Sequence, residues 1–503
     1  MMKKLFAILL IISFAFTLFS CDNSKKPGNN DDEYVLPTEI VDSDVSLPYT
    51  SADSFSAYSV KSSLNRDLLP IIYESLYVAT QNGKGRPLLA KGSVTKGKTI
   101  TVTLKADVSF SDGSFLMADD VKASYNMAKK NEYYKDGLAN IKDVKASGNK
   151  VIFTLYRDDP MALNVLDFPI CKKSGNDYVG TGKYSVAYLD ETPYLQVNTA
   201  HRDFEKSWNK QVALYDMAGI TSPVYSFKAN DISIYKNDLS SADYVNLSPI
   251  TFSENTNNLV FIGLNSKWQG SVAYVNWVRQ VINIGINRRD IASSSFLGQN
   301  TPVVTPFKTE FYGFDDSDLA DISGETEKAI NILERNGYSK FNSEGLRTNG
   351  SRTLKVNILV CSKNAYKVSV AEAVKKSLES LGFKVTITKK KTVKDFKAAL
   401  QEGHFSMYIG EMQLTDNCDL SEFFSASGSA RYGIKSDFYS EYSDYKKGEL
   451  STTEFVEVFS TQVPFIPLFY RKSVISVNPN VKGVDENDIY GSVCYWRMPE
   501  KTK

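Results

Sequence analysis

Residues 99–125 read TITVTLKADVSFSDGSFLMADDVKASY, and this stretch decides the fold. Apolar and polar residues alternate from Thr99 to Lys105, which is the period-two pattern of a strand with one buried face. Residues 111–113, Ser-Asp-Gly, predict a turn, because Asp hydrogen-bonds its own backbone and Gly accepts a positive φ angle. Asp119 and Asp120 then begin an amphipathic helix, since carboxylates are favoured at the positive end of the helix dipole. The stretch therefore predicts a strand, an acidic turn and a helix.

The order of residues in this stretch resembles that of the solute-binding proteins of family 5, the extracytoplasmic receptors of peptide and nickel ABC importers. Members of that family have a strand ending in Phe-x-Asp-Gly, followed by Thr-Ala-Glu/Asp-Asp-Val and a helix. Met117 stands where the Thr is common, so we expect the helix to lack its side-chain N-cap, a loss worth about 1 kcal/mol. The matching residues are Phe110, Asp112, Gly113, Ala118, Asp119, Asp120 and Val121.

Further motifs of the same family follow in the family's order, from about residue 46 to about residue 485. Apolar residues between Leu68 and Leu76 fall on one helical face and predict a helix through Leu76. GTGKY at 180–184 resembles the family's Gly-Thr-Gly-Pro-Tyr, and it lacks the spacing of a phosphate-binding loop, so it predicts a turn before a strand. The other matches are Tyr73-Glu74, Pro87–Ala90, Arg279-Gln280 and the segment 464–470.

The resemblance implies an α/β protein with the two-lobed periplasmic-binding-protein fold (type II, class C) and an extra subdomain in lobe one. Lobe one is expected at residues 45–265, with the extra subdomain at about 60–170. Lobe two is expected at 266–463, and residues 464–503 are expected to return to lobe one. The prolines in VPFIPLFYR, residues 463–471, exclude a helix and favour an extended segment at a sheet edge.

The periodicity of residues 326–409 indicates an α/β second lobe without reference to any family. Three helical patterns, each ending near a Gly, alternate with three short strand patterns. Because strands joined by helical crossovers run parallel, we expect a largely parallel sheet. The helical patterns are at 326–336, 371–381 and 393–400, and the strand patterns are at 354–360, 383–387 and 404–409.

Composition narrows the class of protein. The chain has 503 residues, of which 42% are apolar, so it can bury large cores and more than one domain is expected. Its net charge is +1, so the basic surface of a nucleic-acid-binding protein is not expected. We expect a monomer.

The first residues form a predicted export signal. Lys3 and Lys4 precede an apolar run at 5–19 that is shorter than the about 20 residues needed to span a bilayer. The run ends in Leu-Phe-Ser before Cys21 and resembles a lipoprotein box, which makes 1–20 a lipoprotein signal peptide and Cys21 the acylated N-terminus. A plain secretory leader with an incidental Cys is the alternative. The polar residues at 21–44 are expected to be a flexible tether.

The other cysteines and the histidines carry little information. Export permits disulfides among Cys171, Cys361, Cys418 and Cys494, and free buried thiols are equally compatible with their spacing. Neither C-x-x-C nor a His-rich pattern is present in the sequence, which has two histidines, so no metal site is predicted. No cofactor is predicted either.

The ligand-binding residues are suggested by the loop after the third strand of lobe two. In dipeptide- and oligopeptide-binding members of the family, an Asp in this loop pairs with the α-amino group of the peptide. Alignment on Phe423-Phe424 places Asp416 at that position and makes Asp419 the next candidate. A carboxylate suits this role, because an ammonium enclosed in a cleft needs an opposite charge. The alternative is that residues 415–417 are a polar surface turn.

The function implied is that of a lipid-anchored, exported receptor that captures a small solute, short peptides first, and delivers it to an ABC permease and its ATPase. Glu411 and Met412 stand where the family often has a Trp, which leaves a nickel chelate, a sugar or another solute as alternatives. An adhesin or sensor lipoprotein is a further alternative. An enzyme is not expected, because the sequence has no G-x-S-x-G, H-E-x-x-H or Walker pattern. Closure is expected at crossings near 263–268 and 462–465.

Overall fold

The structure is a computed structural model that describes residues 43–175, 177–241, 244–311 and 321–498. It confirms the predicted strand, turn and helix as β5 (Thr99–Leu104), a turn with Gly113 at φ 81°, and α3 (Ala118–Ala128). Asp112 Oδ1 accepts hydrogen bonds from the Ser114 hydroxyl at 2.6 Å and the Ser114 N–H at 3.0 Å. These bonds lower the pKa of Asp112, whose role here is to form the turn.

Helix α3 begins without a side-chain cap from Met117, as predicted. Asp120 Oδ2 accepts a hydrogen bond of 2.8 Å from the Met117 N–H. This contact is one half of a capping box. The Asp120 carboxylate therefore partly compensates for the missing Thr oxygen at the start of the helix.

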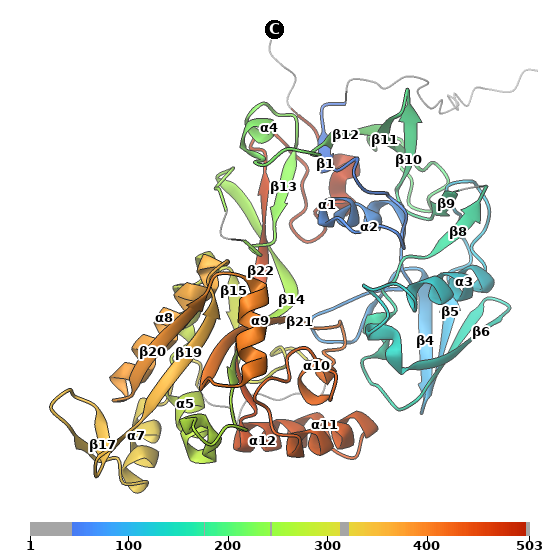
Figure 1. The fold of residues 1–503 in the computed structure, drawn as a ribbon. Helices are drawn as coiled ribbons and strands as arrows, with labels where there is room; N and C mark the ends of the chain where they lie inside the picture. Colours follow the sequence, from blue (N-terminus) through green and yellow to red (C-terminus); the bar gives the residue numbers. More distant parts are fainter. Residues whose placement is uncertain (1–42, 176, 242–243, 312–320, 499–503) are drawn as a thin grey trace, which may run out of the picture. The chain divides into compact units, whose positions relative to one another are not determined.

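Strand β5 lies inside an antiparallel sheet of order β4-β5-β7-β6. Its residues Ile100, Val102 and Leu104 are buried, and α3 covers the same face of the sheet (Figure 1). The other strands are β4 (Ala90–Lys96), β6 (Ile141–Ser147) and β7 (Lys150–Leu155).

The helix predicted to run through Leu76 is wrong. The structure has two short helices, α1 (Ser63–Asp67) and α2 (Leu69–Ile72), and the chain is extended at Tyr73, with φ −125° and ψ 124°. Pro70 has no N–H, so α1 could not continue through it without losing a hydrogen bond, whereas it is tolerated in the first turn of α2. The extended chain instead pairs with distant segments, because the carbonyl oxygen of Glu74 accepts from the Ile170 N–H at 2.8 Å.

The turn predicted at 180–184 is confirmed, and β10 (Tyr184–Leu189) follows it. Two glycines here lie against the backbone of α2. The Gly182 N–H donates to the Ile72 carbonyl oxygen at 3.0 Å. A Cβ built at Gly180 would lie 2.0 Å from that same oxygen. The contact leaves no room for a side chain.

We expect Gly180→Ala to lower the free energy of unfolding by about 1–3 kcal/mol, because the new methyl group forces two backbone segments apart. Urea denaturation measures the change. Gly92→Ala is the matched control, since a Cβ at Gly92 has nothing within 4 Å, and it should stay within about 0.5 kcal/mol of the parent. Equal stability of the two variants would contradict the packing argument.

A second, four-stranded sheet has the order β1-β12-β11-β10. Strand β1 pairs with β12 in parallel, so the start of the described chain is fixed to a strand far along the sequence. Its strands besides β10 are β1 (Ser46–Tyr49), β11 (Thr192–Val197) and β12 (Gln211–Asp216). Smaller elements of this part are β2 (Tyr77–Val78), β3 (Arg86–Pro87), η1 (Gly137–Asn140), η2 (Ala162–Val165), β8 (Cys171–Ser174), β9 (Asp177–Gly180) and α4 (Val224–Lys228).

The largest sheet has the order β13-β22-β14-β21-β19-β20, with β15 also paired to β22. Strand β19 pairs in parallel with both β20 and β21, as the helix-strand alternation predicts. The strands β14 and β22 run antiparallel to their neighbours, so the sheet is mixed. The elements are β13 (Ile234–Asn237), β14 (Ile250–Leu264), β15 (Asn300–Pro302), β19 (Lys355–Cys361), β20 (Lys384–Lys390), β21 (Met407–Gln413) and β22 (Phe465–Val477).

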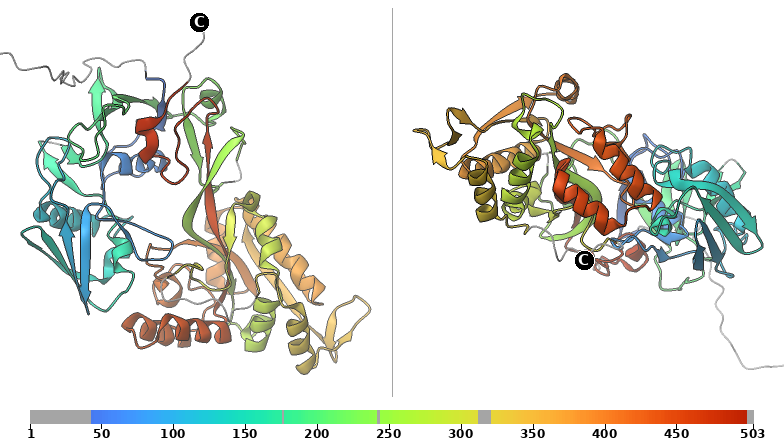
Figure 2. Two further views of the ribbon diagram at one scale, coloured as in Figure 1. Left: turned by 180° about the vertical axis from the view of Figure 1, so that it is seen from behind. Right: turned by 90° about the horizontal axis from the view of Figure 1, so that it is seen from below.

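Helices cover both faces of this sheet (Figure 2). Alternate strand residues face opposite cores: Val260 and Ile262 pack with α5 to α8, whereas Leu259 and Phe261 pack with α9 to α12. This alternation follows from the period of a strand. The helices are α5 (Asn276–Gly285), α6 (Arg288–Ser293), α7 (Thr326–Arg335), α8 (Ala365–Ser380), α9 (Val393–Glu402), α10 (Ser421–Phe424), α11 (Asp437–Lys447) and α12 (Thr452–Gln462). The remaining elements are η3 (Val272–Tyr274), η4 (Phe296–Gly298), β16 (Lys340–Phe341), β17 (Arg347–Asn349), β18 (Arg352–Thr353) and η5 (Gly491–Tyr495).

The extended segment predicted at 463–471 is confirmed as part of β22, but its expected place at a sheet edge is wrong. Strand β22 lies between β13 and β14. Pro467 is tolerated because it sits beside a register shift between Val260 and Phe261, where the ladder is irregular. Its carbonyl oxygen accepts a hydrogen bond of 2.9 Å from Nε of the buried Arg288.

Strand β14 joins two parts of the sheet. Its residues 250–255 pair with β22 only, whereas residues 258–264 pair with both β21 and β22. A second register shift separates these halves, between Asn255 and Leu259. The predicted lobe boundaries at 265/266 and 463/464 stay predictions.

Cys171, Cys361, Cys418 and Cys494 are free and buried, so the described residues contain no disulfide. No helix within the described ranges is both long enough and apolar enough to span a membrane. The predicted signal peptide, Cys21 and nearly all of the predicted tether lie outside the described residues.

Candidate functional site

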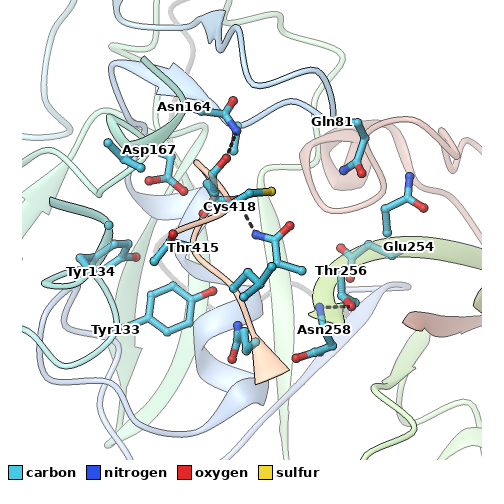
Figure 3. A pocket seen from close by; sticks show the side chains of 18 of the residues that line it. Gln81, Tyr133, Tyr134, Asn164, Asp167, Glu254, Thr256, Asn258, Thr415 and Cys418 are labelled. Carbon is cyan, nitrogen blue, oxygen red and sulfur yellow. Dashed lines mark hydrogen bonds between the residues drawn. The ribbon is translucent and has the colours of Figure 1, made fainter. Parts of the chain in front are cut away.

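A cavity of about 610 Å³ lies where segments far apart in the sequence meet. Residues 63–81 and 132–167 form one part of its lining, the middle of β14 forms another, and the loop after β21 forms a third. In Figure 3, Asp167, Tyr133 and Tyr134 lie on one side of this cavity, and Gln81, Glu254 and Thr256 lie on the other. Pockets of this size hold small ligands.

Asp416 lines this cavity, where the sequence predicted a ligand-binding residue. Strand β21 ends at Gln413, and the Leu414 N–H then donates to the Asn257 carbonyl oxygen at 2.9 Å, which holds the start of the loop on β14. The loop turns back at Cys418, whose N–H donates to Thr415 at 2.8 Å. Asn164 fixes the turn from the other side, because its Nδ2 donates to the backbone carbonyl of Asp416. These contacts leave the carboxyl group of Asp416 half-buried in the cavity wall.

A chain of polar groups surrounds the Asp416 carboxyl group. Asn257 Nδ2 donates to Asp416 Oδ1 at 2.8 Å, and Asn257 Oδ1 accepts from Lys308 Nζ at 2.6 Å. Burial raises the pKa of Asp416, while the hydrogen bond from Asn257 and the charge of Lys308 oppose that rise. Burial also lowers the pKa of Lys308.

Asp167 lines the same cavity as Asp416. Burial, and then the charge of Asp416, raise the pKa of Asp167 well above its ordinary value. Burial and a nearby like charge both disfavour the ionised form of a carboxyl group, which is the cause of this rise.

Sequence reasoning missed Asp167. It comes from the loop after η2, and no pattern of spacing links it to Asp416. One signal was present: Asp167 stands between the buried residues Val165, Leu166 and Phe168, and an acid within an apolar run needs a partner or a ligand. Asn257 and Lys308 were missed for the same reason, since each acts through a contact between distant segments.

Tyr133 and Tyr134 form an aromatic wall of the cavity, with ring centroids 5.0 Å apart in an edge-to-face arrangement. Burial raises the pKa of both phenols, so they are neutral hydrogen-bonding groups. The guanidinium of Arg66 lies 4.6 Å from the centroid of the Tyr133 ring. The face of this ring therefore already holds a cation.

The lining of the cavity is acidic. Among the residues that the structure describes, the lining contains three cationic side chains, Arg66, Lys236 and Lys308, against seven carboxyl groups. Lys236 Nζ is engaged by Asp67 at 2.9 Å and Glu254 at 2.6 Å. The seven carboxyl groups are those of Asp67, Glu132, Asp136, Asp167, Asp238, Glu254 and Asp416.

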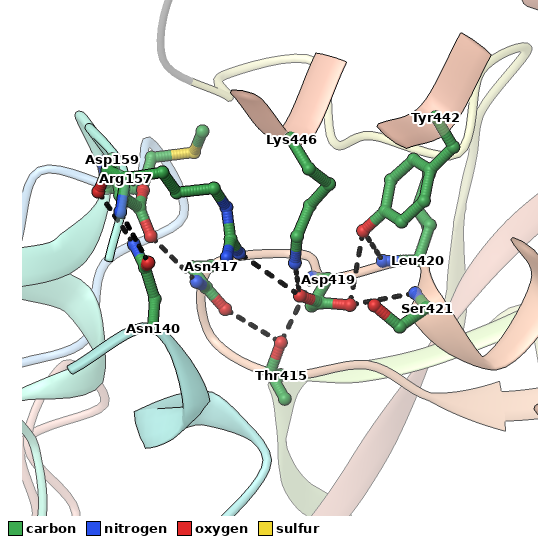
Figure 4. A network of polar contacts seen from close by, with 11 residues as sticks. Asn140, Arg157, Asp159, Thr415, Asn417, Asp419, Leu420, Ser421, Tyr442 and Lys446 are labelled. Carbon is green, nitrogen blue, oxygen red and sulfur yellow. Dashed lines mark hydrogen bonds and ion pairs between the residues drawn. The ribbon is translucent and has the colours of Figure 1, made fainter. Parts of the chain in front are cut away.

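The second predicted residue, Asp419, does not line this cavity. It lines a separate one of about 240 Å³ and belongs to a polar network (Figure 4). Its carboxylate is paired with Lys446 and lies 4.0 Å from the Arg157 guanidinium. It also accepts hydrogen bonds from the Ser421 N–H at 2.7 Å and the Tyr442 hydroxyl at 3.1 Å. Its predicted ligand-binding role stays a prediction, and all of these contacts belong to the fold.

Glu411, which stands in the region where the family often has a Trp, forms an ion pair inside the large sheet. Its two oxygens each lie 2.7 Å from a cation, Arg471 Nε and Lys367 Nζ. Burial raises the pKa of Glu411, but the two cations lower it by more than burial raises it. The pKa of Glu411 is therefore below its ordinary value. Within the part of the chain that the structure describes, no group of three His, Cys, Asp or Glu side chains is placed to hold a metal ion.

Comparisons with known proteins agree with the fold. The oligopeptide-binding protein AppA of Bacillus subtilis is 20% identical over 448 residues, which cover 80% of this chain and 81% of that protein. The nickel-binding protein NikA of Staphylococcus aureus is 20% identical over 440 residues, covering 81% of this chain and 85% of that protein. The crystal structure of the ABC transporter substrate-binding protein CtaP of Listeria monocytogenes superposes with a TM-score of 0.68 at 14% identity, covering 91% of this chain and 99% of that one.

The family profile described as "Bacterial extracellular solute-binding proteins, family 5 Middle" matches residues 84–433. This range includes the strand, turn and helix that decide the fold, every strand of the large sheet except β22, and the loop that carries Asp416. The expectation of a two-lobed α/β solute-binding fold is confirmed. This chain belongs to the family 5 extracellular solute-binding proteins of bacteria.

Proposed function

We propose that this solute-binding protein captures short peptides in the cavity at Asp416 and delivers them to the permease of an ABC importer. The observation that carries this proposal is the position of Asp416, whose carboxyl group lines a cavity of about 610 Å³ at the end of strand β21. The relative AppA is named for oligopeptide binding. A peptide ammonium group at Asp416 would meet the opposite charge that an enclosed cation needs.

The polar lining suits a peptide in a second way. Amide side chains line the cavity on several elements, among them Gln81, Asn164, Asn255, Asn258 and Gln413. An amide both donates and accepts hydrogen bonds, so it can pair with a peptide backbone whatever the side chains of the ligand are. Such a lining favours a ligand recognised through its main chain.

Delivery to a permease requires that the ligand-bound protein differ in conformation from the ligand-free protein. A ligand that touches both lobes favours a closed state, whereas a ligand that touches one lobe shifts nothing. The cavity takes lining from residues 63–167 and from the loop at 413–418, so one ligand can contact both. Closure, the hinge at 263–268 and 462–465, and anchoring through an acylated Cys21 belong to this proposal.

Native mass spectrometry of the protein without residues 1–20 tests the proposed function. We expect the purified protein to carry a ladder of masses that dissociates on mild denaturation and sequences as short peptides. The same protein after unfolding, dialysis and refolding is the control and should be free of them. If the protein carries a nickel chelate or a sugar, the family assignment holds and the proposed peptide ligand is wrong. If the protein is empty and binds nothing from a peptide mixture, the proposed importer role is contradicted.

A further inference from the structure

We propose that a second cavity of this protein, of about 330 Å³, binds a phosphate monoester carried on a sugar-like ring. Lys267 and Arg431 line this cavity and would hold the phosphate, and Trp268 offers a flat apolar surface to the ring. Residues 400–404 of the lining precede strand β21, whereas Asp416 follows it, so the two cavities lie at opposite ends of that strand. They share no described lining residue, and this second site is independent of the proposed peptide function.

Asn265, directly after strand β14, joins two walls of this cavity and is 2% exposed. Its Oδ1 accepts hydrogen bonds from the N–H groups of Lys267 at 3.3 Å and Trp268 at 3.2 Å, which fixes the turn that carries both residues. Its Nδ2 donates to the Gly403 carbonyl oxygen at 2.7 Å, at the end of helix α9. A buried amide with its hydrogen bonds satisfied in this way holds the two walls in place.

Ser266 and Gly433 fix the third wall, which carries Arg431. The N–H and the hydroxyl of Ser266 both donate to the Gly433 carbonyl oxygen, each at 2.9 Å. Gly433 has φ 80°, and a Cβ built there would lie 2.6 Å from the Leu264 carbonyl oxygen. A side chain at this position would keep the two backbone segments apart. The fold therefore shapes the cavity before any ligand arrives.

The two cations of this cavity are available to a ligand. Within the part of the chain that the structure describes, neither Lys267 nor Arg431 forms an ion pair. The Arg431 guanidinium donates a hydrogen bond to the Gly428 carbonyl oxygen at 2.7 Å, which leaves other donors of its planar fork for a ligand. Burial, and then the charge of Arg431, lower the pKa of Lys267, as expected of two cations without an anion between them.

The charge of the cavity favours phosphate over carboxylate. A phosphate monoester has a charge of about −1.5 to −2 near neutral pH, so it matches two cations better than a singly charged carboxylate does. Arginine and lysine are also the side chains that bind phosphate oxygens most often. The described lining has one carboxylate, Glu402, which is exposed and forms no ion pair, so water screens its repulsion of an anion.

Trp268 is the one exposed indole among the four tryptophans of the chain, with an exposed fraction of 38%. A Cβ built at Gly270 would lie 2.5 Å from its ring, and the His404 ring lies across it, with ring centroids 5.6 Å apart at 61°. The backbone at Gly270 and the imidazole of His404 therefore hold the exposed indole in one orientation. A fixed apolar ring beside a few charged groups is the lining that small-molecule sites use.

Calorimetric titration and tryptophan fluorescence of the protein without residues 1–20 test this site. The probes are glucose-6-phosphate, glucose, inorganic phosphate, and phosphatidylcholine vesicles with and without phosphatidylinositol-4-phosphate. We expect glucose-6-phosphate to bind with a dissociation constant below about 1 mM and to change the tryptophan fluorescence. Glucose lacks the charge and should not bind, and inorganic phosphate lacks the ring and should bind about tenfold more weakly. Binding to the phosphoinositide vesicles but not to the free sugar phosphate would place the same chemistry on a lipid headgroup.

Four variants locate the binding. Lys267→Gln should weaken the binding of glucose-6-phosphate by about 10- to 100-fold, the effect of losing one charge-assisted hydrogen bond. Glu402→Gln should tighten it severalfold, because the substitution removes a repelling charge. Trp268→Phe should abolish the fluorescence change, while calorimetry still detects binding. Lys363→Gln is the matched control, since it removes an exposed lysine that forms no ion pair and lies outside the described lining, and it should leave the affinity unchanged.

The proposed site is overturned if neither the sugar phosphate nor the phosphoinositide vesicles bind. Equal binding of glucose, or an equal loss in Lys267→Gln and Lys363→Gln, would overturn it too. Peptide binding, measured in the same variants, should be unchanged, since none of the substituted residues lines the cavity at Asp416. A peptide affinity that falls in Lys267→Gln would overturn the separation of the two sites.

Discussion

Replacing Glu74 with Ala is expected to lower the free energy of unfolding by about 3–5 kcal/mol, because it leaves a buried guanidinium without its carboxylate. The Arg202 guanidinium donates two hydrogen bonds to the Glu74 carboxylate, of 2.7 Å and 2.6 Å, and the Thr181 hydroxyl donates a third of 2.9 Å. The side chains of both Glu74 and Arg202 are less than one tenth exposed, so water cannot replace the lost contact. Urea denaturation measures the loss.

A second carboxylate on the same arginine provides the control. Asp203 lies 3.6 Å from Arg202 Nε, but its side chain is 67% exposed. Exposed ion pairs contribute about 0–1 kcal/mol. Asp203→Ala should therefore be nearly neutral, and a loss equal to that of Glu74→Ala would show that burial is not the cause.

The same group makes the fold sensitive to acid. Burial alone would raise the pKa of Glu74, but the hydrogen bonds from Arg202 and His201 hold it at about 2, against an ordinary value of 4.5. A lowered pKa in the folded state stabilises the protein fully above about pH 4.5, and the gain, on the order of 3 kcal/mol, disappears as the pH falls toward 2. In Glu74→Gln this part of the acid dependence should be absent. An unchanged slope of stability between pH 5 and pH 2 would contradict it.

Asp416→Asn is expected to weaken the binding of free-amine peptides by about 100-fold, the effect of removing one partner from an enclosed charge pair. The variant should fold normally. Because the pKa of Asp416 is raised in the folded state, its charge destabilises the ligand-free protein at neutral pH, and an amide at this position should leave the stability equal or slightly higher. Calorimetry and urea denaturation measure the two quantities.

Asp419→Asn should show the opposite pattern. Its carboxylate is held by Lys446, Tyr442 and the Ser421 N–H, so the amide should lower stability while peptide affinity stays within a few fold of the parent. The two variants remove the same charge from one loop, and the structure places these charges in different cavities. Loss of binding in Asp419→Asn with unchanged stability would reverse the assignment.

Much of the fold could be predicted because the relevant information is local. Periodicity and turn residues predict the alternation of helix and strand from 326 to 409 and the strand, turn and helix at 99–125. The structure has these elements at those places. The helix through Leu76 was wrong for a reason that is not local. The chain becomes extended at Tyr73, where the backbone next to it pairs with a distant segment.

Other features are not local, and they could not be predicted from one chain. Whether the segment at 463–471 lies at an edge depends on β13 and β14, which come from a different part of the sequence. Asp416 was reached through resemblance to a family, but Asp167 lines the same cavity only because the chain around η2 folds against the loop after β21. This arrangement of the site is a property of the tertiary fold.

The reactivity of the free cysteine thiols can report ligand binding and local stability. Cys418 lines the cavity in the same loop as Asp416, and its thiol is buried and neutral near neutral pH. Thiolates rather than thiols react with alkylating reagents. Alkylation of Cys418 therefore requires that the loop open and expose the thiol to solvent. A bound ligand that holds the loop in place would slow that reaction, while Cys171, buried in the sheet strand β8, would react at the rate of unfolding of its own region. Occupancy and local stability could then be followed by mass in the unlabelled natural sequence.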